Sequence, residues 1–390
     1  MISTSHIELS KSALENNLKY LRNYIGDDVQ FSSVVKSNAY GHGIKHFIPL
    51  AISCGIEHFS VFSAEEAKKV LNAAKSEIEI MIMGYIRPRE LEWIINNEVS
   101  FYIFNVERLK HTLEIAKKIK KTAFVHLELE TGLHRTGLEQ EELPEVIKII
   151  KKNKKNIVVS GVCTHFAGAE SIANYYRIQQ QIKKFEKLTL FLRRKGISTG
   201  LHHTACSAAA LIYPETIKDM VRFGIAQYGF WPSKETEVHF FNRMNKQGGI
   251  PISENDSLKR VLSWRSSIMA LKHVSKGEYI SYGNSFLSLR DMTIASVPVG
   301  YYQGYPRKVS NHGYVLINGK RAKIVGIINM NMMVVDVTDI PSAKIGDEVM
   351  LIGRQGDDEI SVTSFSDMAR NLNYETLVSL PHDIERLIVD

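Results

Sequence analysis

Apolar residues follow two alternating patterns along residues 1–230. Short β-branched or aromatic runs, typical of buried strands, alternate with longer stretches in which apolar residues return every three or four positions, as in amphipathic helices. Helix candidates include residues 64–75, 105–119, 139–153 and 174–194. The strand candidates are residues 30–36, 58–62, 78–83, 100–104, 123–129, 157–164, 199–204 and 220–225. Eight strands separated by helices predict a (β/α)8 barrel of the TIM type, with a doubly wound sheet as the alternative.

Local signals for helix starts agree with this alternation. Ser63 precedes the helix candidate that begins at residue 64, and Glu66 follows Ser63 by three positions, which is the pattern of a capping box. Pro88 lies where the first turn of another helix is expected.

The alternation ends near residue 230. Residues 231–258 mix Pro, Gly and polar residues, so we expect them to form a linker. Residues 259–390 are rich in β-type runs, with one helix predicted near residues 364–371. An Asn-Gly pair inside the run VLINGKRAKIVG predicts a β-hairpin. We therefore expect a barrel over residues 1–230 and a smaller, mostly β domain over residues 259–390, with about ten N-terminal residues paired to the β domain.

The composition is that of a globular protein. The 390 residues are 44% hydrophobic and 23% charged, which argues against disorder. The longest apolar stretches, such as residues 47–56, have about half the length that a bilayer span requires, and residues 1–10 lack the pattern of a signal peptide. The three cysteines are widely spaced and odd in number. We therefore expect no disulfide framework, no metal site, no membrane partner and a reducing, cytoplasmic compartment.

The net charge of +7 comes largely from lysine runs at residues 117–121, 151–155 and 183–187. Each run fits a helical period, so we interpret the runs as solvated helix faces. A nucleic-acid-binding surface would interleave aromatic or Gly-Arg residues with the lysines; that pattern is absent, and we expect no nucleic-acid partner. The positive field can still attract anionic small molecules, including phosphates.

Lys36 ends the first predicted strand, and active sites of barrels lie at the C-terminal ends of their strands. A lysine in the poorly hydrated mouth of a barrel has a lowered pKa, which favours Schiff-base chemistry. A solvated lysine at a strand end explains this single feature equally well.

Other strand ends carry polar residues as well. They are Arg135, His165, Ser207 and Arg222. Ser207 opens a helix after the seventh strand and comes near the amides of Gly224 and Ile225 after the eighth, which is the common phosphate site of barrels. Taken singly, a histidine here is more often packed and an arginine more often an ion-pair partner. Their convergence on one rim favours a cofactor site.

The segment of residues 34–43 (VVKSNAYGHG) resembles the pyridoxal-phosphate signature of the alanine racemase family. Further matches follow in order along essentially the whole chain. They are Thr164-His165-Phe166-Ala167, Met220-Val221-Arg222-Phe223-Gly224-Ile225, Ser281-Tyr282-Gly283, Pro298-Val299-Gly300-Tyr301 and Asn373-Tyr374-Glu375. The first motif is highly specific to the family.

The resemblance implies that Lys36 forms a Schiff base with pyridoxal 5'-phosphate and serves as one catalytic base. Tyr282 would be the second base, on the opposite face of the substrate carbon. A hydrogen-bond chain is implied from Tyr282 through His165 to Arg222 and His203. In the family this tyrosine reaches the barrel of the other subunit, which implies a head-to-tail homodimer.

The resemblance also implies how the cofactor and the small amino-acid substrate are held. Arg222 would face the pyridine nitrogen and leave it unprotonated, because arginine does not readily give up a proton. Arg135 would contact the cofactor's phenolic oxygen and the substrate carboxylate. Tyr301 and Met330 match positions around the substrate entrance. The residues that match phosphate-binding positions are Tyr40, Ser207, Gly224, Ile225 and Tyr374.

Three positions depart from the family pattern. Glu128 stands where the family often has a carbamylated lysine, and we interpret it as a built-in anion for Arg135. Cys206 replaces the asparagine before the phosphate-binding serine, so one phosphate contact is in doubt. Asn331 replaces an acid at the substrate entrance, which can change the side chains admitted.

The sequence therefore predicts a racemase, an isomerase that interconverts L- and D-alanine and supplies D-alanine for cell-wall synthesis. A racemase for serine, lysine or several amino acids is the nearest alternative. A decarboxylase of the same fold would not need the segment around Tyr282, and a non-catalytic cofactor-carrying protein would not need residues 259–390.

Overall fold

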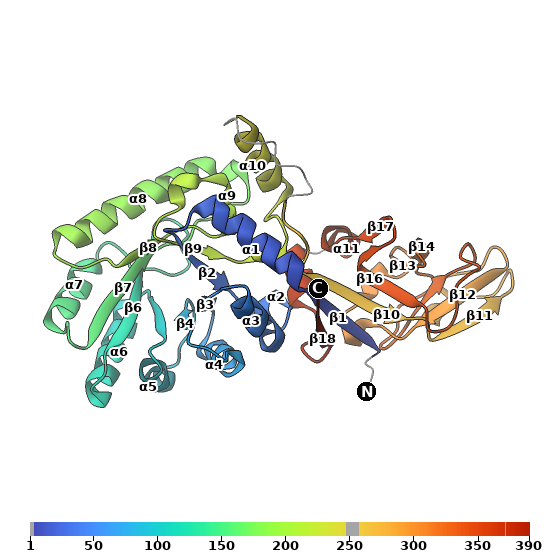
Figure 1. The fold of residues 1–390 in the computed structure, drawn as a ribbon, viewed down its shortest axis with the longest axis horizontal. Coiled ribbons are helices and arrows are strands. Elements are labelled where there is room, and N and C mark those ends of the chain that lie inside the picture. Colours follow the sequence, from blue (N-terminus) through green and yellow to red (C-terminus); the bar gives the residue numbers. More distant parts are fainter. Residues whose placement is uncertain (1–3, 247–256, 371) are drawn as a thin grey trace. The chain divides into compact units, whose positions relative to one another are not determined.

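The computed structural model describes residues 4–246, 257–370 and 372–390. The chain forms two compact units (Figure 1). Residues 13–36 and 48–259 form what we call the barrel unit, and residues 1–12, 37–47 and 260–390 form the β unit. Lys36 thus belongs to the barrel unit, whereas the eleven residues that follow it belong to the β unit.

The barrel unit is built on one eight-stranded sheet. In chain order its strands are β2 (Gln30–Val34), β3 (His58–Val61), β4 (Glu79–Ile82), β5 (Ser100–Ile103), β6 (Ala123–Glu128), β7 (Ile157–Cys163), β8 (Leu201–His203) and β9 (Met220–Phe223). Each strand from β2 to β7 pairs in parallel with the next along the chain, and β2 also pairs in parallel with β9. An isolated parallel bridge between Cys206 and Arg222 links the ends of β8 and β9. The sequential order confirms the predicted (β/α)8 type and excludes the doubly wound alternative.

Helices separate these strands. They are α1 (Lys11–Ile25), α3 (Ile44–Ser53), α4 (Ala64–Ala73), η1 (Pro88–Glu90), α5 (Leu91–Asn96), α6 (Val106–Ile119), α7 (Leu143–Lys152), α8 (Tyr175–Arg194) and α9 (Ser207–Ile212). The Ser63 hydroxyl accepts from the amide of Glu66 at 3.3 Å, which confirms the predicted N-cap of α4. The Glu66 carboxylate accepts from the amide of Phe62 at 2.8 Å instead of from Ser63. Pro88 begins the turn that leads into α5, as predicted.

Part of the expected linker is helical. Residues 234–246 form α10 (Lys234–Lys246), which buries Thr236 and Phe240. The Phe240 ring lies 5.2 Å from the ring of Tyr24 on α1. The segment is too polar to show a helical apolar stripe, which is why its composition indicated a linker. Residues 247–256 of the expected linker lie outside the described residues.

The β unit contains two sheets. The larger has the order β14–β13–β16–β10–β1–β18, with β17 paired to β16, and the smaller has the order β11–β12–β15. The strands are β1 (Ser5–Ser10), β10 (Leu262–Ser267), β11 (Ala270–Val274), β12 (Met292–Val297), β13 (Tyr314–Ile317), β14 (Lys320–Lys323), β15 (Met333–Asp336), β16 (Glu348–Gln355), β17 (Asp358–Ile360) and β18 (Glu385–Val389). The N-terminal β1 is antiparallel to β10 and parallel to β18. The predicted Asn-Gly hairpin joins β13 and β14, with positive φ at Asn318 and Gly319.

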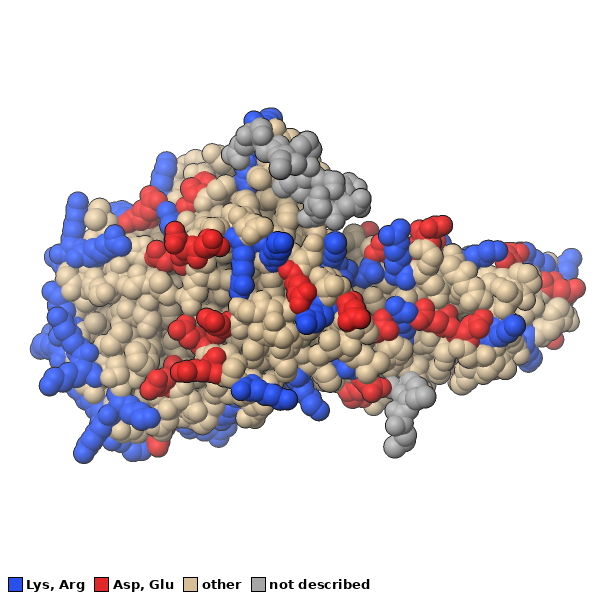
Figure 2. Space-filling model, in the orientation of Figure 1, with Lys and Arg blue, Asp and Glu red and all other residues tan. Residues whose placement is uncertain are grey.

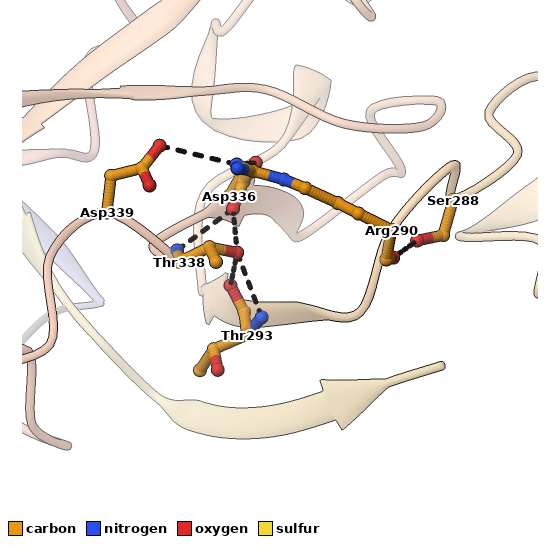
Figure 3. A network of polar contacts seen from close by, with 6 residues as sticks. All are labelled: Ser288, Arg290, Thr293, Asp336, Thr338 and Asp339. Atoms are coloured by element: carbon orange, nitrogen blue, oxygen red, sulfur yellow. Dashed lines mark hydrogen bonds and ion pairs between the residues drawn. The ribbon is translucent and has the colours of Figure 1, made fainter. Parts of the chain in front are cut away.

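Two helices of the β unit follow β17, where one was predicted. They are α11 (Val362–Met368) and α12 (Asn373–Val378). In the smaller sheet, the Arg290 guanidinium lies 3.3 Å from a carboxylate oxygen of Asp336 and 3.3 Å from one of Asp339 (Figure 3). The Thr338 hydroxyl bonds the other Asp336 oxygen at 2.5 Å and accepts from the amide of Thr293 at 3.0 Å. These contacts tie the end of β15 to the start of β12.

Basic side chains outnumber acidic ones in this protein, 49 to 42. Lys and Arg side chains gather along the part of the barrel unit formed by α6 and α7, while both signs are mixed elsewhere on the visible face (Figure 2). Among the described residues, no helix combines the length and apolar character needed to cross a membrane.

Candidate active site

Lys36 lies two residues beyond the end of β2, at the C-terminal end of the barrel strands where it was predicted. Its side chain is half-buried. Burial lowers the pKa of the Lys36 amine, and the positive charges of Arg135 and Arg222 lower it further. Glu66 and Cys206 act in the opposite direction without reversing the shift. The amine is therefore more readily unprotonated than that of a solvated lysine, as a nucleophile requires.

The residues after Lys36 form a left-handed turn. Residues 37–40 all have positive φ, between 51° and 56°, although none of them is glycine. This conformation costs roughly 1–2 kcal/mol per residue, so the surrounding contacts must hold it. The Asn38 carbonyl accepts from the amide of Gly43 at 2.8 Å, and the Asn38 side chain accepts from the amide of Ile44 at 3.0 Å. Asn38 thus bonds two consecutive amides at the far end of the turn.

Arg222, on β9, is buried at the end of the strand next to β2. Its Nη1 donates to Nδ1 and to the carbonyl oxygen of His203, and its Nη2 donates to the carbonyls of Thr164 at 2.8 Å and Thr204 at 3.2 Å. Among the described residues, the Nε hydrogen of Arg222 has no acceptor. Burial alone would lower the pKa of the guanidinium, but the nearby Tyr102 and other ionisable groups raise it above its ordinary value. Arg222 therefore keeps its charge.

A chain of buried histidines extends from Arg222. His203 Nδ1 lies 2.6 Å from Nη1 of Arg222, and His203 Nε2 lies 2.9 Å from Nδ1 of His126. Burial, with the charge of Arg222 as a further cause, lowers the pKa of His203 well below its ordinary value, and burial lowers that of His126 to about 3. Both rings are neutral near pH 7.

His165, which follows β7, lies close enough to Arg222, Arg135 and Lys36 to feel their charges. Burial, assisted by these charges, lowers its pKa to about 3. The structure contains no hydrogen bond between His165 and Arg222, so this link of the expected chain is not formed here. Arg222 bonds the backbone carbonyl of the preceding residue, Thr164, instead.

Glu128 ends β6 with its side chain buried. Burial raises the pKa of its carboxyl group, while a hydrogen bond from Thr136 and the charge of Arg135 oppose the rise. Its Oε2 has no hydrogen-bond partner among the described residues. The Arg135 side chain is exposed, and the structure holds no direct ion pair between the two residues. The charge of Arg135 therefore acts on Glu128 without an ion pair between the two side chains.

Ser207 begins α9, and its hydroxyl accepts from the amide of Gly224 at 3.0 Å and from that of Ala226 at 3.4 Å. Ile225 lies between these two amides and begins the 3-10 turn η4 (Ile225–Tyr228). The structure thus brings together the three groups predicted after the seventh and eighth strands. Cys206 precedes α9 with a half-buried side chain and makes no side-chain capping bond.

The other predicted site residues belong to the β unit. Tyr282, in η6 (Tyr282–Asn284), is 71% exposed. Its neighbour Ser281 has φ of 65° and donates to the carbonyl of Ile327 at 2.8 Å. Tyr301, in η7 (Tyr301–Gln303), donates its amide to the carbonyl of Asn329 at 3.1 Å.

The remaining predicted site residues of the β unit lie in two pairs of neighbouring segments. Met330, whose side chain is exposed, comes directly after Asn329. The backbone bond from Tyr301 to Asn329 therefore holds the segments of Met330 and Tyr301 together. The rings of Tyr40 and Tyr374 lie 6.1 Å apart, centroid to centroid. Asn331 is exposed beside Met330.

Two residues with clear roles in this site were not predicted. His126 lies two positions before Glu128 on β6. Because alternate residues of a strand point to the same face, the position of Glu128 could have indicated that His126 faces the same side. Gln181, on α8, is buried and bonds the Thr131 hydroxyl, the His165 carbonyl and the Ala167 amide at 2.9–3.1 Å. The sequence did not indicate this role, because Gln181 is a single polar residue within a long amphipathic helix. Among the described residues, no group of three or more His, Cys, Asp or Glu side chains is arranged to hold a metal ion.

Comparisons with known proteins agree with this geometry. Residues 9–232 match the family model for the alanine racemase N-terminal domain, and residues 261–388 match that for the C-terminal domain. A protein of Leptospira interrogans serogroup Icterohaemorrhagiae serovar copenhageni, named alanine racemase, is 35% identical over 387 residues, which are 99% of this chain and 96% of that protein.

Solved structures are similar over the full chain. Alanine racemase from Bacillus anthracis with bound L-Ala-P has a TM-score of 0.87 at 28% identity, covering 100% of this chain and 96% of that one. Alanine racemase from Bartonella henselae with covalently bound pyridoxal phosphate has a TM-score of 0.83, covering 100% of both chains; at 24% identity this likeness is one of fold. The matches in both parts of the chain lead to one conclusion: the chain belongs to the alanine racemase family.

Proposed function

We propose that this protein binds pyridoxal 5'-phosphate covalently through Lys36 and interconverts L- and D-alanine. The observation that carries the proposal is the position of Lys36: it is half-buried at the C-terminal end of a barrel strand, and burial and two arginines lower the pKa of its amine. Family membership supports the reaction, and the site supports the cofactor.

The residues present fit pyridoxal phosphate. All four Nη hydrogens of Arg222 have protein acceptors, and the Nε hydrogen is left for a ligand acceptor such as the pyridine nitrogen. Ser207 and the amides of Gly224 and Ile225 form a compact polar group suited to a phosphate. The family resemblance adds the hydroxyls of Tyr40 and Tyr374, on the β unit, as further candidates.

Pyridoxal phosphate, when bound, supplies an electron sink that makes the α-proton of an amino acid acidic. Racemisation then needs one group that takes the proton from one face and another that delivers a proton to the other face. Lys36 is suited to be one of these groups because its amine is readily unprotonated. Tyr282, exposed on the β unit, is our candidate for the second.

Arg222 limits the chemistry to proton exchange. Because its pKa is raised, Arg222 donates a hydrogen bond but not a proton. A ring nitrogen that receives only a hydrogen bond withdraws fewer electrons, which disfavours side reactions such as transamination. His165 is neutral near pH 7 and can accept or donate a hydrogen bond beside the reacting groups.

Arg135 is suited to bind the carboxylate of the substrate. Its guanidinium is exposed, and the buried Glu128 supplies an anion near it. We propose that Glu128 acts as a fixed substitute for a carbamylated lysine. Tyr301 and Met330 would form the entrance, and Asn331 beside them leaves open a wider range of amino-acid side chains than alanine.

We further propose that two copies form a head-to-tail homodimer in which each site uses Lys36 of one subunit and Tyr282 of the other. The β unit exposes several aromatic and apolar side chains. These are Tyr282 at 71%, Leu289 at 78%, Tyr302 at 61%, Met330 at 56% and Tyr301 at 41%. Side chains of this kind exposed together are typical of interaction sites.

We infer a cytoplasmic enzyme that supplies D-alanine for cell-wall synthesis. None of the three cysteines takes part in a disulfide within the described part of the chain, which fits a reducing compartment. Neither a nucleic acid nor a membrane is expected as a partner.

Reduction with borohydride tests the attachment. The purified protein with pyridoxal phosphate should absorb visible light, and borohydride followed by peptide mass analysis should locate the added group on Lys36. The variant Lys36→Ala should gain neither the absorbance nor the group. A protein that stays colourless with added pyridoxal phosphate, or a group on another lysine, would contradict the proposal.

A further inference from the structure

We propose that Arg386 is a positioning residue that holds the loop after Lys36 and thereby strengthens the binding of pyridoxal phosphate. Arg386 lies in β18, 345 residues after Gly41, the loop residue that it contacts. The proposal rests on the proposed function only for the identity of the cofactor. The contacts themselves lie entirely within the β unit, to which residues 37–47 belong.

Arg386 uses a buried charge to bind backbone carbonyls. Its side chain is 3% exposed. Nη2 donates to the carbonyl of Gly41 at 2.9 Å, and Nη1 donates to the carbonyls of His382 at 3.1 Å and Ile384. Burial lowers the pKa of the Arg386 guanidinium to about 10, and the charge of Asp383 opposes this shift. Within the described part of the chain, Arg386 takes part in no ion pair. A buried charge is tolerated where it is hydrogen-bonded, and here the two Nη groups make three such bonds, one of which reaches the loop. The buried Nε of Arg386 has no partner among the described residues.

The two glycines of the loop fit this contact. Gly41 has φ of +79°, and a Cβ there would lie 1.9 Å from the carbonyl oxygen of Leu377. Gly43 has φ of +89°, and a Cβ there would lie 3.1 Å from Cδ and 3.2 Å from Nε of Arg386. Glycine at these positions therefore allows the C-terminal segment to approach the loop. The segment Gly41-His42-Gly43 is shaped by this approach, whether or not a cofactor is bound.

The contact matters because the loop is strained. Residues 37–40 have positive φ without any glycine, so the loop tends to relax unless its ends are held. Lys36 lies before this turn and Gly41 after it. Fixing the Gly41 carbonyl therefore fixes Tyr40, which is a candidate phosphate ligand and lies beside the ring of Tyr374.

Hydrogen exchange and cofactor titration test the proposal with one pair of variants. Arg386→Met removes the donors and keeps an apolar stem, and Arg354→Met removes an exposed arginine from β16 as the matched control. In the apoprotein, Arg386→Met should speed exchange of the amides of Gly41 and Gly43 by about tenfold. It should also raise the Kd for pyridoxal phosphate by about tenfold. The control should change neither.

Two results would overturn the proposal. One is unchanged exchange at residues 37–47 in Arg386→Met. The other is a uniform increase in exchange across β18, β1 and β10, which would mean that Arg386 only stabilises the sheet. If the wild-type chain does not bind pyridoxal phosphate at all, the proposed function fails, but the exchange measurement still decides whether Arg386 holds the loop.

A double-mutant cycle gives a second, independent test. Gly43→Ala should raise the Kd for pyridoxal phosphate in the wild type, and clearly less so in an Arg386→Ala background, because the three atoms nearest to the added methyl group belong to Arg386. Gly41→Ala is the matched control: its methyl group meets the backbone of Leu377, so Arg386→Ala should bring no relief. Additive effects of Gly43→Ala and Arg386→Ala would contradict the proposal.

Discussion

Nη1 of Arg222 lies 2.6 Å from Nδ1 of His203, and this contact sets the direction of a buried hydrogen-bond chain. Arginine has no acceptor, so His203 Nδ1 must accept, and the His203 proton resides on Nε2. That proton is donated to Nδ1 of His126, 2.9 Å away. Arg222 thus donates to His203, and His203 donates to His126. Both rings act as neutral hydrogen-bond acceptors along this chain.

Removing the last acceptor should destabilise this chain. In His126→Leu the Nε2 hydrogen of His203 has no partner, and a buried unsatisfied donor costs about 1–3 kcal/mol of the free energy of unfolding. Denaturant unfolding measures the loss. His273→Leu replaces an exposed histidine on β11 and should change the stability much less. Equal losses in the two variants would show that the His126–His203 bond contributes nothing.

Acid should destabilise the protein through its buried histidines. Burial lowers the pKa of His58 from 6.5 to about 4. Between these values the unfolded chain binds the proton and the folded chain does not, so the stability is full above pH 6.5 and falls as the pH drops toward 4. This one group contributes a slope of about 1.4 kcal/mol per pH unit. His58→Gln should reduce the measured slope by about that amount, whereas His273→Gln should leave it unchanged.

Glu128→Gln tests the role of the buried carboxylate. The amide keeps the shape of the side chain and removes the charge that supports Arg135, so we expect kcat/KM for alanine to fall about tenfold, mainly through a higher KM. Steady-state kinetics at pH 8 measure the effect, since the raised pKa of Glu128 favours its neutral form as the pH falls. Glu141→Gln, on an exposed loop, is the control. Unchanged turnover and affinity in Glu128→Gln would show that Arg135 needs no anion there.

Mixing two inactive variants tests the shared site. Lys36→Ala and Tyr282→Ala should each be inactive alone. If each site uses one residue from each subunit, mixed dimers contain one intact site, and random exchange of subunits restores about a quarter of the wild-type activity. The activity should grow as the subunits exchange. No recovery, with mixed dimers demonstrated, would mean that Lys36 and Tyr282 act within one subunit.

The sequence predicted the barrel because its strands are short, apolar and separated by periodic helices. The strand predicted at residues 123–129 is found at Ala123–Glu128 and that at 157–164 at Ile157–Cys163. Helix α9 has six residues, too few to show a helical period, and α10 buries only two side chains among those described, so its polar composition hid it.

The part of the site that lies at the C-terminal ends of the strands could be predicted from the sequence. The expectation that active sites lie at these strand ends brought together Lys36, Arg222 and Ser207. The bond between His126 and His203 joins strands separated by β7, and nothing across their sequence separation of 77 positions indicates it. The left-handed turn after Lys36 was also beyond prediction, since its four positive-φ residues include no glycine and one of the bonds at its end comes from Arg386, 345 positions later.

The most direct test of the account is the exchange of the α-proton of alanine in deuterated water. The wild-type protein should introduce deuterium into the α position of both L- and D-alanine while it interconverts them. Tyr282→Phe should suppress the exchange from L-alanine much more than that from D-alanine, because Lys36 still serves one face. Equal loss from both enantiomers would contradict the two-base assignment, and no exchange by the wild-type protein with any amino acid would contradict the proposed racemase.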